Sequence, residues 1–342
     1  MDDVVHPRDV VHPLDVVHLT RRPHPHQRSI ELVFDTVRAH LPADVAVRVV
    51  TSSHYSSGVL PRLRAVLEAR RLQGRVTHVV GDIHYVTLLM RRRRTVLTVH
   101  DVEFLDRASF LKRLLYGWLW LRLPVARSAL VTVPSEGSRR ALVRTLGRDP
   151  GVRVVPNPLR PGFVHVPRGE RSGAPVVLLI GTWPNKNLPR SAEALRGLPV
   201  HVVLIGPVDD RQRGLLDDAV PAWTHHPGPD DEGVVRLLRE CDLLLFPSLH
   251  EGFGLPIVEA QATGRPVVTS DREPMTEVSG GAAVLVDPED VASIRAGVLR
   301  VLEDDDLAAE LVRRGLANVE RFAPAAVAER YAALYRELAV AE

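Results

Sequence analysis

Cysteine is almost absent, since Cys241 is the single one among 342 residues. This excludes an intramolecular disulfide and a cysteine-based zinc site, and it fits a reducing compartment. The sequence also lacks an apolar run of the roughly 18–20 residues that a membrane-spanning helix needs. Its first residues are acidic and rich in histidine, unlike a secretory signal peptide. We therefore expect a cytoplasmic protein.

Lysine is the second scarce residue, because only Lys112 and Lys186 occur among the 44 basic residues. The formal net charge is +2, but it is unevenly distributed. Residues 1–160 hold 26 basic and 14 acidic residues, a net charge of +12, and residues 161–342 hold 18 and 28, a net charge of −10. Such asymmetry predicts two modules, and the basic one could attract a nucleic acid, an anionic membrane or an anionic substrate. Because no binding motif accompanies the arginine run 91–94, a nucleic-acid partner is not expected.

The chain alternates short β-branched runs with longer amphipathic stretches, as in βαβ units that build a parallel sheet. Before this alternation, Asp-Val-Val-His begins at residues 3, 9 and 15, a period too short for a solenoid. Residues 1–14 are interpreted as a mobile low-complexity extension whose histidines form a tag-like tail, although a metal site is the alternative. The expected strands are 15–20, 45–50, 77–80, 95–99, 130–133, 152–155, 176–180, 200–205, 242–246 and 266–269. The expected helices are 29–41, 59–73, 109–126, 135–146, 188–196, 231–240, 256–263, 288–302, 308–321 and 324–338.

The alternation is interrupted at 156–173, where proline and glycine are dense. The sequence therefore predicts an α/β protein of two Rossmann-like, doubly wound domains, over 15–160 and 161–323. Open sheets of this kind bind ligands at the carboxyl ends of their strands, so the cleft between the two domains is the expected site.

The segment 249–259 carries the strongest chemical signal and follows the expected strand 242–246. Gly252 and Gly254 permit a tight turn close to a ligand, and Pro256 suits the first turn of a helix. The free N–H groups around Phe253–Leu255 would then form an anion site at a helix N-terminus.

Two carboxylates, Glu251 and Glu259, flank this anion site. A carboxylate beside a phosphate is useful only where it accepts hydrogen bonds from ligand hydroxyls. Phosphate donors combined with hydroxyl acceptors predict a nucleotide sugar as ligand. The alternative interpretation is a capped helix with a surface glutamate.

Two further segments end expected strands. Gly181–Asn187 follows strand 176–180 as a second phosphate-type loop, in which Lys186 supplies a compact charge; an ordinary turn is the alternative. His100 and Asp101 end strand 95–99, where a histidine could bind a sugar or assist proton transfer, or simply belong to a turn. No Walker sequence is present, so an ATPase is not favoured.

Together these segments resemble the retaining glycosyltransferases of GT-B fold, a family that includes bacterial polysaccharide, lipopolysaccharide and mannosyl transferases. The resemblance extends over about 15–337 and is most specific at Glu251–Glu259, which looks like the E-x7-E signature of the family. Supporting matches are Gly181–Asn187, Thr98–Asp101, Val133–Glu136 and Val154–Asn157. The resemblance implies a donor-binding C-terminal domain and a last helix, within 324–342, that crosses back to the N-terminal, acceptor-binding domain.

The resemblance also implies roles at the matching positions. His100, Glu251 and Lys186 are the expected catalytic residues, with Lys186 neutralising the diphosphate leaving group and His100 beside the donor sugar. Glu251 and the Gly252–Leu255 amides are expected to hold the sugar hydroxyls and a phosphate, and Glu259 the ribose hydroxyls. The full expected donor-binding set is Gly181, Thr182, Asn185, Lys186, Gly206, Glu251, Gly252, Phe253, Gly254, Leu255 and Glu259. The stretch 223–226 falls where such enzymes seat the base.

The sequence departs from the family pattern at two places. Asn185 stands beside Lys186 where the family usually has an arginine, and Arg190 could substitute for it. The loop after the first strand has no glycine, and an arginine side chain could replace the missing amides. The acceptor-side candidates are Arg21, Arg22, His24, His26, Arg28 and Asp101.

The expected reaction is transfer of a sugar from a nucleoside-diphosphate sugar to an acceptor hydroxyl. Lys186 and a helix dipole can stabilise the leaving phosphate, and no Asp-x-Asp motif ends a strand, so no metal or other cofactor is expected. The alternatives are an inverting GT-B transferase with His24 or His26 as base, a nucleotide-sugar epimerase, and an inactive sugar-nucleotide-binding subunit. The stretch 110–122 combines Leu and Trp with basic residues, and it either packs on the N-terminal sheet or contacts an anionic membrane.

Overall fold

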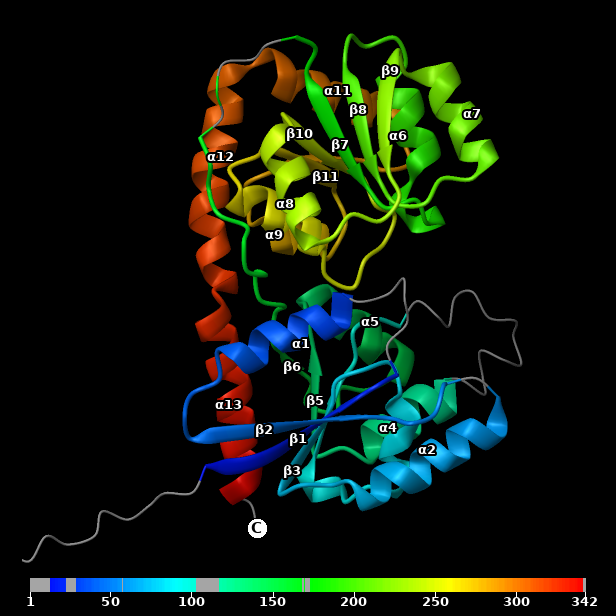
Figure 1. The fold of residues 1–342 in the computed structure, drawn as a ribbon, viewed down its shortest axis with the longest axis vertical. Helices are drawn as coiled ribbons and strands as arrows, with labels where there is room; N and C mark the ends of the chain where they lie inside the picture. The colour runs from blue at the N-terminus through cyan, green and yellow to red at the C-terminus, as the bar shows by residue number, and fades with distance from the viewer. Residues whose placement is uncertain are drawn as a thin grey trace, which may run out of the picture. The chain divides into compact units, whose positions relative to one another are not determined.

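A computed structural model describes residues 13–22, 29–56, 58–102, 117–167, 169 and 173–340. The chain divides into two compact units. Unit 1 comprises residues 1–133, 142–155 and 324–342, and unit 2 comprises 134–141 and 156–323. Each unit holds a six-stranded parallel sheet flanked by helices, which confirms the predicted α/β fold (Figure 1). The tag-like extension lies almost entirely outside the described residues.

The sheet of unit 1 has the order β2-β1-β3-β4-β5-β6, so the chain reverses direction across the sheet between β1 and β3. Its strands are β1 Leu14–Thr20, β2 Val45–Thr51, β3 Val76–Val79, β4 Thr95–Thr98, β5 Leu130–Val133 and β6 Arg153–Val154. Apolar side chains such as Leu19, Val79 and Leu97 cover one face. That face packs on α2 Val59–Arg71, η1 His84–Leu89, α4 Leu123–Ala126 and the end of α5 Glu136–Leu146. The short 3-10 turn η2 Arg92–Arg94 and the π-helix η4 Gly117–Arg122 complete the described part of unit 1.

The opposite face of this sheet mixes buried valines with polar side chains and is covered by α1 Ser29–Ala39 and α13 Pro324–Val340. The guanidinium of Arg38, which has only donors, lies 3.3 Å from Nδ1 of His18, so Nε2–H of His18 donates to Tyr335 Oη at 2.8 Å. Tyr335 then donates to Nδ1 of His78 at 2.8 Å, and Nε2–H of His78 donates to Thr98 at 2.7 Å. This chain ties α13 to β1, β3 and β4. His18 belongs to the third Asp-Val-Val-His copy and is therefore a core residue.

The sheet of unit 2 has the order β12-β11-β10-β7-β8-β9. Its strands are β7 Val176–Ile180, β8 His201–Ile205, β9 Ala222–His226, β10 Leu243–Phe246, β11 Val267–Ser270 and β12 Val284–Val286. Alternate strand residues face two separate apolar layers, so helices pack on both sides. One layer is formed with α6 Leu188–Leu195, α7 Asp210–Ala219, α11 Val291–Glu303 and α12 Asp305–Val319. The other is formed with α8 Asp231–Glu240, α9 Leu255–Ala262 and α10 Met275–Ser279.

Four elements of unit 2 were not among the expected ones: β9, β12, α7 and α10. The edge strand β9 contains a threonine and two histidines, and β12 has only three residues, so neither gives a strong pattern. Helix α7 did carry a signal, because Asp209 and Gln212 form a capping box in which each side chain accepts a hydrogen bond from the backbone N–H of the other residue. Of the expected helix 109–126, residues 109–116 lie outside the described part and the rest forms η4 and α4.

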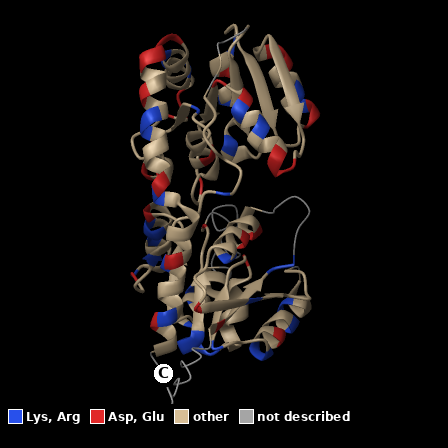
Figure 2. Ribbon diagram, turned by 60° about the vertical axis from the view of Figure 1, so that its left-hand side comes forward, with Lys and Arg blue, Asp and Glu red and all other residues tan. Residues whose placement is uncertain are grey.

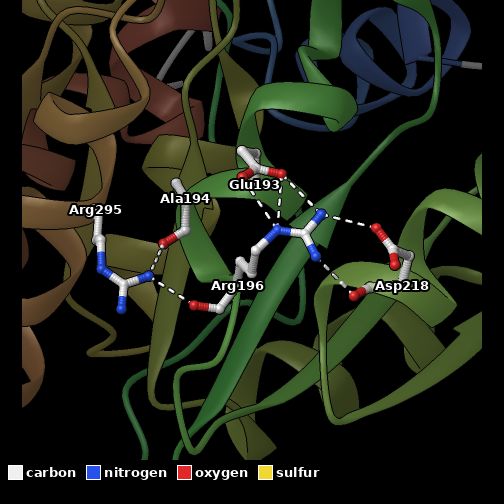
Figure 3. A network of polar contacts seen from close by, with 5 residues as sticks. All are labelled: Glu193, Ala194, Arg196, Asp218 and Arg295. Atoms are coloured by element: carbon white, nitrogen blue, oxygen red, sulfur yellow. Dashed lines mark hydrogen bonds and ion pairs between the residues drawn. The ribbon is translucent and has the colours of Figure 1, made fainter.

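Charged residues of both signs occur along many of the helices (Figure 2). One surface network joins three helices of unit 2 near the amino ends of the strands (Figure 3). Arg196, which follows α6, pairs with Glu193 and with Asp218 of α7, both at 2.9 Å. Arg295 of α11 donates to the carbonyl oxygens of Ala194 and Arg196 at 3.0 and 2.8 Å. The network fixes α11 against the end of α6, away from the carboxyl edge of the sheet.

Candidate functional site

The candidate site of unit 2 lies where β7 and β10 pair as neighbours at the centre of the sheet. From β7 the following strands β8 and β9 are added on one side of the sheet, and from β10 the strands β11 and β12 are added on the other. In open α/β sheets, ligands bind where the strand order reverses in this way, here between β7 and β10. The loops after both strands meet there. Leu249 N–H donates to Asn185 O at 2.8 Å, and the Asn185 amide donates to His250 O at 3.2 Å. The two strongest sequence motifs are thereby brought into contact.

The central contact of the site joins Lys186 to Glu251. Lys186 Nζ lies 2.5 Å from Glu251 Oε1 and 4.6 Å from the centre of the Phe246 ring. The two charged side chains are only 18% and 14% exposed. Gly181 makes this position possible: its φ is +90°, and a Cβ there would lie 2.9 Å from Cγ of Lys186. The site thus holds a cation and a carboxylate at one point, and a ligand with both phosphate and hydroxyl groups could separate them.

Gly206 and Thr182 bring the loop after β8 against the loop after β7. Thr182 Oγ1 donates to Pro207 O at 2.5 Å, and Gln212 donates to Thr182 O at 2.9 Å. At Gly206, φ is +133° and a Cβ would come within 3.3 Å of Thr182 Cγ2. The expected base-binding stretch 223–226 forms most of β9, and its His225 Nε2 lies 2.6 Å from Gly206 O.

Asn187 fixes the end of the loop Gly181–Asn187, called the lysine loop because it holds Lys186. The sequence predicted no role of its own for Asn187. It adopts the left-handed conformation with φ +60°, and its buried amide donates to Pro247 O at 3.1 Å and Pro288 O at 2.6 Å. Its Oδ1 accepts from Arg190 at 3.2 Å. Arg190, the candidate second cation, is therefore engaged with the loop itself.

The turn before α9 follows the predicted geometry. Gly254 has φ +107° and is the N-cap, and Pro256 occupies the first turn. Phe253 is buried against Phe322, with ring centres 5.6 Å apart, so its side chain anchors the turn and only its backbone can serve a ligand.

Two serines that carried no predicted role hold the carbonyl oxygen of Gly252. Ser135 and Ser138 donate to it at 3.0 and 2.7 Å. The adjacent N–H groups of Glu136 and Gly137 donate to the Glu277 carboxylate at 3.1 and 3.2 Å. All of these residues belong to unit 2. By holding the carbonyl oxygen of Gly252, the two serines fix the orientation of the peptide groups in the turn before α9.

Glu259 is 3% exposed and is paired with Arg160, a residue that sequence reasoning missed. Arg160 Nε donates to Glu259 Oε1 at 2.7 Å, and its Nη1 lies 2.6 Å from Asp231 Oδ1. Burial raises the pKa of Glu259 above its ordinary value, and Arg160 offsets part of this effect. Arg160 stands in the irregular segment after Pro158, where no periodic pattern marks a side chain as buried.

The candidates of unit 1 surround the carboxyl ends of its strands. His100, 8% exposed, follows β4, and its Nε2–H donates to Val80 O at 3.1 Å. Arg21 follows β1 and pairs with Glu31 at 2.9 Å and Asp82 at 3.1 Å. These contacts place Arg21 at the point between β1 and β3 where the chain reverses direction.

Two of the other acceptor-side candidates, Arg22 and Asp101, lie in the described part of the chain. The Arg22 guanidinium lies 4.2 Å from the centre of the Tyr55 ring, and Asp101 is exposed. His24, His26 and Arg28 lie outside the described residues.

In the part of the chain that the structure describes, no group of three or more His, Cys, Asp or Glu side chains could hold a metal ion. No helix within the described ranges is long and apolar enough to cross a bilayer.

Comparison with known proteins gives the family. A sequence profile described as "Glycosyl transferases group 1" matches residues 174–304, which include the whole unit 2 site except Arg160 and the serines. The chain is 30% identical to the O-antigen chain mannosyltransferase B of Escherichia coli over 263 residues, 68% of this chain and 67% of that protein. It is 28% identical to the MMP alpha-(1->4)-mannosyltransferase of Mycolicibacterium hassiacum over 236 residues, 65% of this chain and 57% of the relative.

Solved structures agree on the fold. The crystal structure of HepE from Anabaena in complex with UDP and glucose matches 95% of this chain and 100% of its own, with a TM-score of 0.72 and 17% identity. WaaG, a glycosyltransferase involved in lipopolysaccharide biosynthesis, matches 94% and 99% with a TM-score of 0.67 and 14% identity. The chain belongs to the group 1 glycosyltransferases of GT-B fold.

Proposed function

We propose that this glycosyltransferase transfers a hexose from a nucleoside-diphosphate sugar to an acceptor hydroxyl with retention of the anomeric configuration. The observation that carries the proposal is the Lys186–Glu251 pair, 2.5 Å long, at the point where β7 and β10 adjoin. The N-terminus of α9 begins four residues after Glu251 and supplies amides to the same place. A cation, a carboxylate and free amides are the groups that a sugar diphosphate needs.

In the proposed donor complex, the ion pair between Lys186 and Glu251 breaks, and Lys186 pairs with the diphosphate instead. Glu251, released from the lysine, accepts from the sugar hydroxyls, while the amides of Gly252–Leu255 donate to a phosphate. Gly181, Thr182, Asn185 and Gly206 shape the neighbouring loops so that the nucleotide can approach the backbone. Ser135 and Ser138 act as positioning residues because they hold the Gly252 carbonyl away from the ligand.

Glu259 is proposed to accept from the ribose hydroxyls. Burial alone favours its protonated form, which would accept less well, and Arg160 counteracts this by pairing with the carboxylate. Arg160 therefore keeps Glu259 an acceptor with a fixed orientation.

The reaction breaks the bond between the anomeric carbon and the leaving phosphate oxygen and forms a bond from that carbon to the acceptor oxygen. The acceptor proton goes to the departing phosphate, so no side-chain base is required. Negative charge grows on the diphosphate, and Lys186 with the α9 amides stabilises it, which accounts for a reaction without a metal or other cofactor. His100, Arg21, Arg22 and Asp101 are proposed to contribute on the sugar and acceptor side.

A cytoplasmic location, with peripheral contact to an anionic membrane and no nucleic-acid partner, belongs to the same proposal. It is supported by the single cysteine and by the net charge of +12 on residues 1–160.

The test is a screen of UDP-, GDP- and dTDP-hexoses by calorimetry, followed by donor hydrolysis and transfer assays. Lys186→Ala and Glu251→Ala are each expected to lower kcat by about 10²–10³. Glu310→Ala, which removes a partly exposed carboxylate paired with two arginines of α12, is the matched control and is expected to leave kcat unchanged. Product anomers are read by NMR. Inversion would refute retention, interconversion of the donor without acceptor would indicate an epimerase, and binding without turnover would indicate an inactive subunit.

A further inference from the structure

The first turn of α5 is capped by a side chain from a distant part of unit 2. The first backbone N–H groups of any helix have no partner inside the helix. In α5 the Glu277 carboxylate accepts two of them, from Glu136 at 3.1 Å and from Gly137 at 3.2 Å. The next one, from Ser138, donates to Ser135 Oγ at 3.0 Å. Because Glu277 belongs to α10, the start of α5 is fixed by a tertiary contact.

The start of α5 also lies very close to the segment that leads into α10. A Cβ at Gly137 would come within 3.2 Å of Glu273 Cβ and 3.3 Å of the backbone of Pro274, so only glycine fits without displacing this segment. Arg140 and Glu273 form an ion pair between the same two elements. That pair is exposed and contributes little, so the Glu277 carboxylate is the main polar contact that holds this turn of the helix.

Helix α10, which carries Glu277, is itself tied to its neighbours by buried amide side chains. Gln261 of α9 donates to Ser279 O at 3.0 Å, and Asn318 of α12 donates to Val278 O at 2.8 Å. Asn318 also donates to Gln261 Oε1 at 2.8 Å, which joins the two amides. Glu277 therefore stands on a helix that is held against the far end of α9.

The capped turn of α5 delivers two hydroxyl groups to one carbonyl oxygen. Ser135 and Ser138 both donate to Gly252 O, at 3.0 and 2.7 Å, which occupies both of its lone pairs. The peptide bond between Gly252 and Phe253 is trans, so its N–H points opposite to its C=O. The Phe253 N–H is thus directed away from α5, and among the described residues it has no acceptor. It is left for a ligand beside Glu251.

We propose that Glu277 is a positioning residue for the donor diphosphate: through the first turn of α5 and its two serines, it aims the Phe253 N–H at a phosphate. The inference rests on the proposed function and adds to it a residue that acts only through others. A carboxylate at a helix N-terminus also stabilises the helix, so a loss of stability alone does not distinguish the two roles. An effect on the phosphate that spares the base and the ribose does distinguish them.

The experiment compares the wild type and E277Q in calorimetric binding of UDP, GDP and dTDP and of the nucleosides uridine, guanosine and thymidine. Glutamine keeps one oxygen acceptor, but its amide group meets the other N–H of α5, so half of the cap is lost. A hydrogen bond to a charged group is worth a factor of about ten, so we expect E277Q to bind the preferred diphosphate about tenfold more weakly. Its affinity for the corresponding nucleoside is expected to be unchanged.

Kinetics and a second variant extend the test. Negative charge on the diphosphate grows in the transition state, so kcat is expected to fall by a larger factor than KM for the donor rises. S138A removes one of the two hydroxyl donors and is expected to lower diphosphate affinity in the same direction. In an S135A/S138A background, E277Q is expected to have little further effect, because the serines no longer transmit it. E273Q, which breaks the exposed pair with Arg140, is the matched control.

Three results would overturn the inference: an unchanged preference for diphosphate over nucleoside in both E277Q and S138A, an equal loss of affinity for both ligands, or additive effects in the combined variant. The second is what a general distortion of unit 2 would produce. If the wild type binds none of the three nucleotides, the proposed function fails together with the inference. If the wild type binds and turns over its donor but Glu277 has no effect on the phosphate, the inference alone fails.

Discussion

Replacing Arg160 by methionine tests the buried ion pair beneath the site. Glu259 is 3% exposed, and Arg160, 13% exposed at its side chain, is 2.7 Å from it. Removing one partner leaves a buried carboxylate uncompensated, which costs about 3–5 kcal/mol. For a unit of this size, each kcal/mol corresponds to about 2–4 °C, so we expect Arg160→Met to lower the melting temperature of unit 2 by roughly 6–20 °C.

The same variant has a predictable pH dependence. Burial already raises the pKa of Glu259, and without Arg160 its pKa rises further. The folded state then holds a proton at pH values where the unfolded chain, with a carboxyl pKa of about 4.3, has lost it. The destabilisation is therefore greatest above the raised pKa and shrinks as the pH falls through it.

The assay is differential scanning calorimetry from pH 7.5 down to about pH 5, with Arg160→Met, E259Q and the double variant R160M/E259Q. The double variant is expected to recover most of the loss, since a neutral amide replaces the unpaired charge. Arg196→Met is the control because its two carboxylate partners lie on the surface. The reasoning is refuted if Arg160→Met melts like the wild type, or if its penalty stays constant on acidification.

Three further predictions concern other buried contacts. Gly181→Ala places a methyl group 2.9 Å from Lys186 Cγ, so the lysine must move and donor affinity measured by calorimetry is expected to fall; equal affinity would contradict this packing. Tyr335→Phe removes the hydroxyl between His18 and His78 and is expected to cost unit 1 about 1–3 kcal/mol, with faster amide exchange in α13 as the readout. Burial lowers the pKa of His18 to about 3, whereas the unfolded value is about 6.5. The stability of unit 1 is therefore complete above about pH 6.5 and falls as the pH drops toward 3, and a flat profile of exchange or unfolding across that window would refute it.

Local pattern was sufficient for the six strands of the unit 1 sheet and for four of the six strands of the unit 2 sheet. The strands β7, β8 and β10 are continuous apolar runs because both of their faces are covered, and such runs are visible in sequence. The edge strand β9 was missed because polar residues interrupt its apolar pattern, and β12 was missed because it has only three residues. The motif 249–259 and the lysine loop were visible for a different reason: glycines with positive φ and a proline in the first helical turn leave a local signature.

The sequence by itself determined the α/β class, the two Rossmann-like halves and the segments that hold Lys186, Glu251 and Glu259. Only the tertiary structure decided their partners. Arg160 meets Glu259 across 99 residues of chain, and His18 meets Tyr335 across 317, so no local period can record either contact.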